Sequence, residues 1–237
     1  LYGIGSAYSL LDKVQVLLPR STRRDTYEFV EYRRWRAGEV WRFGPFAVTD
    51  PYRTVVDIAR TSAFRYALGY VDGLAREYDV EREELRAYAQ ANCRGLHGIA
   101  RAFDVFEYMD GRSDNGGESE ARAAMLLAGI AAPELQIELA RPGNSGYYLA
   151  DYGWQMPDGS WMLAELHGLG KFEDDTQNDL EHAAAKTYRA ALLRDANLRA
   201  MGHNVIHFKL SDTYDVDAFG AMMRGYGIPT TKPFADS

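Results

Sequence analysis

The sequence has little cysteine and no long apolar run, and both absences exclude classes of protein. A single cysteine, Cys93, excludes an internal disulfide and a zinc site built from several cysteines, and it favours a reduced cytoplasm. No hydrophobic stretch approaches the roughly 20 residues that cross a bilayer, and we find no secretory signal, so we expect no membrane partner. The net charge of −7 argues against a protein that coats nucleic acid by bulk attraction.

What is present is the composition of an ordinary globular protein. The 237 residues, 46% of them hydrophobic, suffice for one large domain or two modest ones. Because the chain starts at Leu1 without a methionine, we expect it to be part of a longer protein. The pattern predicts an α/β (α+β) fold, with a small β plus helical region over residues 1–112 and an α/β domain with a mixed central sheet over 113–237.

The predicted elements change in type along the chain. Residues 1–48 alternate as strands do, residues 49–109 have helical periodicity, and the polar glycine-rich segment 110–117 predicts a domain boundary. An order of α–β–β–(β)–α–β follows. The expected helices are Tyr52–Arg60, Ala63–Tyr78, Glu81–Gln90, Gly95–Met109, Glu118–Ala128, Asp179–Met201 and Val216–Tyr226, and the later strands are Leu135–Ala140, the hairpin Tyr147–Leu166 and Asn204–Leu210.

The most informative segment is a predicted hairpin with the tight turn Pro157–Gly159. Proline and glycine there suit a three-residue loop, which leaves Met156 opposite Ser160. Counting outward places Asp151 directly opposite Glu165. Cross-strand partners have Cβ atoms about 5 Å apart and like charges there repel, so we expect a cation between the two carboxylates or a proton on one of them.

Carboxylates in this arrangement suggest a metal site for phosphodiester hydrolysis. Mg²⁺ or Mn²⁺ would be held by Asp151 and Glu165, and His167 falls on the same strand face because side chains alternate. A bound ion polarises the phosphate and activates water. Glu118 could supply a third acid, and Lys171 could place an ammonium near the phosphate or the attacking water.

From Glu118 to about Asp212 the chain resembles the PD-(D/E)XK nuclease superfamily, most closely the branch related to very-short-patch repair endonucleases in actinobacteria. The resemblance implies a restriction-endonuclease-like domain that acts on DNA. His167 stands where such domains usually carry aspartate, which alters the preferred metal or marks lost catalysis. The superfamily lysine, expected two residues after the glutamate, is absent at that position, and Lys171 could replace it from a shifted position. The matching residues are Glu118-Ser119-x-x-Arg122, Gln136, Asp151, Glu165-Leu-His167-Gly168-x-x-Lys171-Phe172, Arg194-Asp195 and Gly202-x-x-Val205-Ile206.

The N-terminal half has a second resemblance. Leu1-Tyr-Gly, Leu18-Pro19 and the segment Val48–Arg60 resemble AbiEi-type antitoxins of abortive-infection toxin–antitoxin systems. The resemblance implies autoregulatory DNA binding by a winged helix ahead of this region, and a cognate toxin as partner. The alternative function is therefore a non-catalytic regulator with a degenerate nuclease fold.

Arginine residues are the candidates for nucleic-acid contact. A basic segment contains Arg33, Arg34 and Arg36, and Arg194 lies on the long predicted helix. The planar guanidinium suits phosphate oxygens, although the basic segment slightly favours the alternative interpretation, a solvated, salt-bridged strand surface.

Structural alternatives exist for each candidate site. Asp151 and Glu165 could belong to a salt-bridged sheet face, with Arg122 or Lys186 as partners, and Glu118 with Arg122 could be an ordinary helix ion pair. Three further sets carry alternatives. These are His203 with His207 as zinc ligands or packed histidines, Trp154 with Trp161 as a cross-strand pair or a base-stacking surface, and Cys93 as a core residue or a nucleophile.

Overall fold

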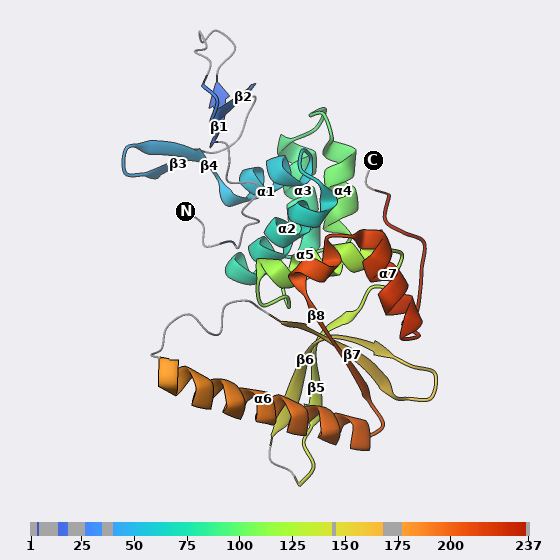
Figure 1. Cartoon of the computed structure of the whole chain (residues 1–237). Coiled ribbons are helices and arrows are strands. Elements are labelled where there is room, and N and C mark those ends of the chain that lie inside the picture. Colours follow the sequence, from blue (N-terminus) through green and yellow to red (C-terminus); the bar gives the residue numbers. More distant parts are fainter. Residues whose placement is uncertain are drawn as a thin grey trace. The chain divides into compact units, whose positions relative to one another are not determined.

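The computed structural model describes residues 4, 14–18, 27–34, 40–143, 146–167 and 177–235. Within these residues the chain has seven α-helices and eight β-strands and an α/β fold with a mixed sheet, as predicted (Figure 1). The chain divides into two compact units between Ala123 and Ala124. None of the described helices combines the length and the apolar character that crossing a membrane requires.

The described strands of the N-terminal region form two small sheets. Strand β1 (Val14–Leu18) pairs with β2 (Val30–Arg34) in parallel, and β3 (Val40–Phe43) pairs with β4 (Phe46–Thr49) as an antiparallel hairpin. The predicted β-rich start is confirmed in these segments. The parallel pairing was not predicted, because alternation along one strand does not show the direction of its neighbour.

Four helices pack together in the first unit and all four were predicted: α1 (Pro51–Ala59), α2 (Phe64–Tyr78), α3 (Arg82–Asn92) and α4 (Ile99–Phe106). Helix α4 begins later than predicted because Gly98, with φ 77°, turns the chain immediately before it. Fully buried apolar side chains form the core between them, among them Val55, Leu68, Leu74, Leu85 and Val105.

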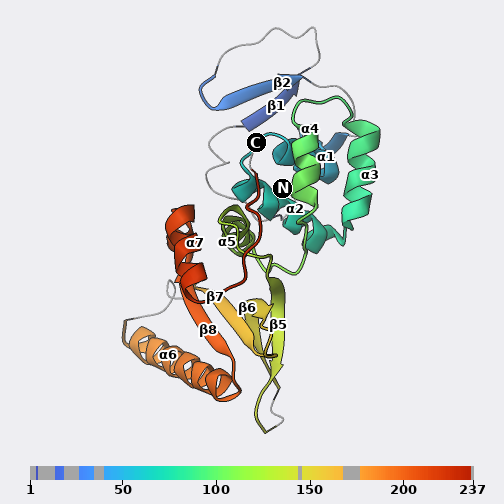
Figure 2. The ribbon, with the colours of Figure 1, turned by 90° about the vertical axis from the view of Figure 1, so that its right-hand side faces the viewer.

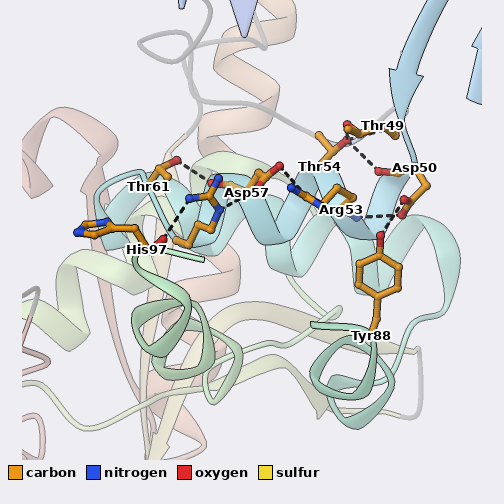
Figure 3. A network of polar contacts seen from close by, with 9 residues as sticks. Thr49, Asp50, Arg53, Thr54, Asp57, Thr61, Tyr88 and His97 are labelled. Carbon is orange, nitrogen blue, oxygen red and sulfur yellow. Dashed lines mark hydrogen bonds and ion pairs between the residues drawn. The ribbon is translucent and has the colours of Figure 1, made fainter. Parts of the chain in front are cut away.

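Helix α1 begins as its sequence predicts. The Asp50 carboxylate accepts the backbone N–H of Arg53 at 2.9 Å, and Pro51 occupies the first helical position (Figure 3). The Tyr88 hydroxyl donates to the same carboxylate at 2.8 Å. Burial, followed by this hydrogen bond to Asp50, raises the pKa of Tyr88. One aspartate thus caps α1 and ties it to α3.

The other end of α1 is held by ion pairs. The Asp57 carboxylate accepts hydrogen bonds from Nε of Arg53 at 2.8 Å and from Nε of Arg60 at 2.6 Å (Figure 3). Arg60 also donates a hydrogen bond to the carbonyl of His97. The Arg53 side chain is only 1% exposed. Asp50, Arg53, Asp57 and Arg60 lie in the segment Val48–Arg60, for which the sequence predicted a resemblance to antitoxins, and in the structure their contacts stabilise the helical unit. Nearby Cys93 is buried, which confirms its core position and raises its pKa.

Helix α5 (Gly116–Leu127) is joined to α2 by buried charges. Nη2 of Arg122 donates to both carboxylate oxygens of Asp72, at 2.8 and 2.7 Å. A second pair joins Arg65 and Glu120 at 2.7 Å. The first part of α5 therefore belongs to the helical unit, and the division between the units falls within this helix rather than in the polar segment before it.

The second unit contains a four-stranded mixed sheet. Strands β5 (Glu134–Ala140), β6 (Tyr147–Gln155) and β7 (Trp161–His167) are antiparallel neighbours, and β8 (Asn204–Lys209) adds to β7 in parallel. Helix α6 (Gln177–Ala200) connects β7 to β8, as a parallel pair requires. The predicted order of one helix, three strands, a helix and a strand is confirmed.

The two faces of β8 pack against different helices, and both helices, α6 and α7 (Val216–Gly225), lie near this strand in Figure 2. Leu198 of α6 joins a buried cluster with Ile137 and Leu163. Phe208 points to the opposite face of the sheet from its neighbours in β8, because strand side chains alternate. It packs against Phe219 of α7, with ring centroids 5.2 Å apart. The sheet therefore has an α6 side and an α7 side, and the candidate site lies on the α6 side.

The hairpin turn has the predicted geometry. The N–H of Met156 donates to the carbonyl of Ser160 at 2.8 Å, and Gly159 has φ 83°, in the left-handed region. The pairing of Tyr152 with Ala164 continues the predicted register.

The predicted tryptophan pair is wrong. In the observed register Trp154 lies opposite Met162, and Trp161 lies opposite Gln155. The two tryptophans therefore point to opposite faces of the hairpin, because neighbouring positions alternate. Nε1 of Trp154 donates to the carbonyl of Ala131 at 2.8 Å, so its polar edge has a structural partner.

Gly153 is required by close packing. A Cβ atom there would lie 2.7 Å from Cγ1 of Ile137 and 3.0 Å from Cε3 of Trp161. We expect Gly153→Ala to lower the free energy of unfolding of the second unit by about 1–3 kcal/mol, through overpacking. Urea denaturation followed by tryptophan fluorescence measures this. The control Gly225→Ala, where a Cβ meets no atom within 4 Å, should cost nothing. Equal stability of the two variants would contradict the packing argument.

Candidate functional site

Asp151 of β6 and Glu165 of β7 lie at the same end of the hairpin. They are the next residues of the two strands beyond the observed pair Tyr152–Ala164, on the side away from the turn. Oδ2 of Asp151 accepts the backbone N–H of Leu166 at 2.8 Å, so one carboxylate oxygen is fixed against the neighbouring strand. Both acidic residues are half-buried. The structure therefore brings the two predicted carboxylates together.

The cation beside these carboxylates is Arg194 of α6. Its Nη1 donates to Oε2 of Glu165 at 2.7 Å, and its Nη2 donates to Oε1 of Glu165 and to the carbonyl of Leu149. Burial lowers the pKa of Arg194, but the hydrogen bond and charge of Glu165, with the charges of Asp151 and Asp195, raise it overall. The expected neutralising cation is thus supplied by the chain itself.

This partner differs from those considered in the sequence. The expected salt-bridge partners were Arg122 and Lys186, whereas Arg194 was assigned to nucleic acid. Arg122 pairs with Asp72 in the first unit, and the side chain of Lys186 lies outside the described residues. The choice of Arg194 depends on how α6 packs on the sheet, which spacing in the sequence does not reveal.

A histidine–aspartate group extends the site. His207 of β8 lies beside Glu165 in the parallel register, and its Nε2 is 2.8 Å from Oδ2 of Asp195. The ring of His167, which is exposed, stacks on His207 with centroids 4.8 Å apart. Oδ1 of Asp195 and Nδ1 of His207 are buried and have no hydrogen-bond partner among the described residues.

Sequence reasoning missed the roles of Asp195 and His207. Asp195 was named only as part of the Arg194-Asp195 match, and His207 was paired with His203 as a possible zinc site. His203 instead accepts the N–H of Trp161 through Nδ1 at 3.2 Å. The adjacency of Arg194 and Asp195 was the available signal, because neighbours in a helix can reach two adjacent strands.

Glu118 belongs to the first unit, whereas Asp151 and Glu165 belong to the second. Its carboxylate accepts the backbone N–H of Asp114 at 2.8 Å and the side-chain amide of Asn115 at 2.7 Å. These bonds stabilise the start of α5, so Glu118 has a structural function there. Its role as a third acid stays a prediction.

Several predicted contact residues are not described. Lys171 and Arg36 lie outside the described residues. Arg33 and Arg34 lie in β2, but their side chains are also outside the described part. The proposed contacts of these residues with phosphate therefore stay predictions.

The donor set partly fits a hard divalent cation. Asp151 and Glu165 supply carboxylate oxygens, which Mg²⁺ and Mn²⁺ prefer. The described residues contain no assembled group of three histidine, cysteine, aspartate or glutamate ligands, and both oxygens of Glu165 are bonded to Arg194. An ion bound by this pair would have to displace Arg194 from Glu165.

Comparisons with known proteins add relatives but no activity. No family model matches the chain, and no solved structure matches it. It is similar to the uncharacterized proteins MT2308 of Mycobacterium tuberculosis strain CDC 1551 / Oshkosh and Rv2248 of strain ATCC 25618 / H37Rv, each 30% identical over 154 residues. The match covers 65% of this chain and 55% of each relative, so the chain spans little more than half the length of either relative.

Proposed function

We propose that the protein is a metal-dependent endonuclease that hydrolyses DNA phosphodiester bonds, with Mg²⁺ or Mn²⁺ held by Asp151 and Glu165. The supporting observation is the approach of these two carboxylates at one end of β6 and β7, next to a single guanidinium. The predicted resemblance to PD-(D/E)XK nucleases assigns the same two residues to catalysis. The proposal includes DNA as partner and the cytoplasm as location.

The charges around the site favour a cation. Three carboxylates, those of Asp151, Glu165 and Asp195, lie near one guanidinium, that of Arg194. The additional Arg199 is 3.8 Å from Asp195 and 59% exposed, so it compensates weakly. The excess of negative charge would be balanced by a divalent ion.

The chain's own residues would prepare the site for chemistry. The N–H of Leu166 orients Asp151, and Asp195 orients His207 beside Glu165. Such outer contacts commonly set the orientation of metal-site residues. A bound ion would supply the polarisation of the phosphate and the activation of water.

A second function is favoured by two contacts at the site. Arg194 binds both oxygens of Glu165, and the ring of His167 is stacked on His207. These contacts suit a fold that has lost its ion and serves as a non-catalytic regulator of antitoxin type, with DNA and a toxin protein as partners.

Nicking of supercoiled plasmid DNA tests the proposal. We expect cleavage with Mn²⁺ or Mg²⁺, none with EDTA, and none for Asp151→Asn, which keeps the size of the side chain but removes its charge. The exposed Glu138 of β5 provides the control Glu138→Gln, which should cleave normally. Salt-sensitive DNA binding without cleavage would instead support the regulator. Absence of both cleavage and DNA binding would contradict both functions.

A further inference from the structure

We propose that Arg194 is an exchangeable counter-ion of the candidate metal site: it fastens α6 to the sheet, and a divalent ion that replaces it at Glu165 loosens this helix. The inference rests on the proposed metal-binding function. It adds a regulatory link between occupation of the site and the attachment of a long helix.

The described contacts of α6 with the sheet are concentrated in one turn. Arg194 bonds to Glu165 in β7 and to the Leu149 carbonyl in β6. Asp195 bonds to His207 in β8. Two neighbouring residues of the helix therefore reach three strands, and Arg194 alone connects two of them.

The rest of this turn adds one polar and one apolar contact. Nδ2 of Asn197 donates to the Tyr148 hydroxyl at 2.7 Å, and Leu198 is fully buried in the cluster with Leu163. Immediately before Arg194, Leu192 and Leu193 are 51% and 59% exposed. Loss of the Arg194 hydrogen bonds would therefore remove a large part of the contacts between this turn and the sheet. The buried Leu198 would still keep the helix packed against the sheet.

Competition between the guanidinium and a divalent ion follows from the geometry. Glu165 has two carboxylate oxygens and both accept hydrogen bonds from Arg194. An ion at Glu165 must break these charge-assisted bonds, which are stronger than neutral ones. It brings two positive charges to a place where Arg194 brings one, so the exchange also balances the second carboxylate, Asp151. Removal of the guanidinium should consequently strengthen binding of the ion.

A purely structural salt bridge would behave differently. In that case Arg194→Gln would loosen α6, but it would leave the affinity for an ion unchanged, and an ion would leave the helix unchanged in the native chain. Ion affinity and helix protection must therefore be measured together.

The experiment uses the full chain and Mn²⁺ alone as the probe. Isothermal titration calorimetry gives the dissociation constant for Mn²⁺, and hydrogen exchange gives the protection of amides over residues 189–200. We expect Arg194→Gln to bind Mn²⁺ at least about tenfold more tightly than the native chain. We expect Mn²⁺ to speed exchange in α6 of the native chain and to leave the already faster exchange of Arg194→Gln unchanged.

Two further variants serve as controls. Arg199→Gln removes a nearby exposed guanidinium and should behave as the native chain does. Arg194→Lys keeps the charge but lacks the planar fork, so we expect a Mn²⁺ affinity between those of the native chain and Arg194→Gln. If Arg194→Gln fails to fold, the comparison with Arg194→Lys decides, and equal affinity of the lysine variant and the native chain overturns the inference.

The outcomes separate this inference from the proposed function. Binding of Mn²⁺ to the native chain, with no gain in Arg194→Gln and no change in α6, overturns the exchange but retains the metal site. Binding by Arg194→Gln alone supports the exchange and overturns metal-dependent catalysis by the native chain. Binding by neither chain overturns both.

Discussion

Asp72→Ala should lower the free energy of unfolding of the first unit by about 3–5 kcal/mol, because it leaves the buried guanidinium of Arg122 without its partner. The Asp72 side chain is 0% exposed and that of Arg122 is 5% exposed. Asp72 also accepts the backbone N–H of Asp110 at 2.9 Å, and this donor would lose its partner too. Urea denaturation followed by circular dichroism measures the change.

An exposed pair in the same unit provides the control. Arg82 and Glu83 are 3.8 Å apart and are 44% and 81% exposed. Glu83→Ala should cost less than about 1 kcal/mol because solvent screens such a pair. A similar small cost for Asp72→Ala would show that water reaches Arg122 in solution, contrary to its burial here.

Glu165→Ala should abolish metal-dependent nicking and also destabilise the second unit. We expect activity to fall by at least about 100-fold, because Glu165 is one of the two carboxylates that would hold the divalent ion at the reacting phosphate. We expect the free energy of unfolding to fall by about 1.5–3 kcal/mol, the typical contribution of hydrogen bonds to charged groups, because Arg194 loses both oxygens. Plasmid nicking and urea denaturation measure the two effects.

The comparison with Asp151→Ala makes this prediction specific. In Asp151→Ala, Arg194 keeps both of its bonds to Glu165, so α6 should stay attached to the sheet while activity falls by an equal amount. Glu138→Ala, at an exposed position of β5, should change neither. If Glu165→Ala destabilises the unit while the native chain never cleaves DNA, then Glu165 serves to anchor α6 and the regulator is the better function.

Helix boundaries and the hairpin were predictable because their signals are local. Asp50 caps α1, and Gly202 follows α6 with φ 88°, as expected after its last turn. The hairpin register follows from the turn that ends at Gly159. In each case the residues that determine the geometry lie within a few positions of one another.

Partners distant in the sequence were not predictable in the same way. Arg122 and Asp72 are 50 positions apart, and Arg194 and Glu165 are 29 apart. Several acids and arginines could have formed each pair on grounds of charge alone. Only the packing of α5 on α2, and of α6 on the sheet, decides which of them meet.

The sequence by itself determined the order of elements, the turn, and the approach of Asp151 to Glu165, because backbone preferences and strand alternation act over short distances. It also predicted either a cation between these carboxylates or a proton on one of them, because like charges repel. The tertiary structure decided that Arg194 supplies this cation and that His207 and Asp195 adjoin the site. Those contacts depend on where a helix of 24 residues lies on the sheet, and the burial of side chains such as Leu198 determines that position.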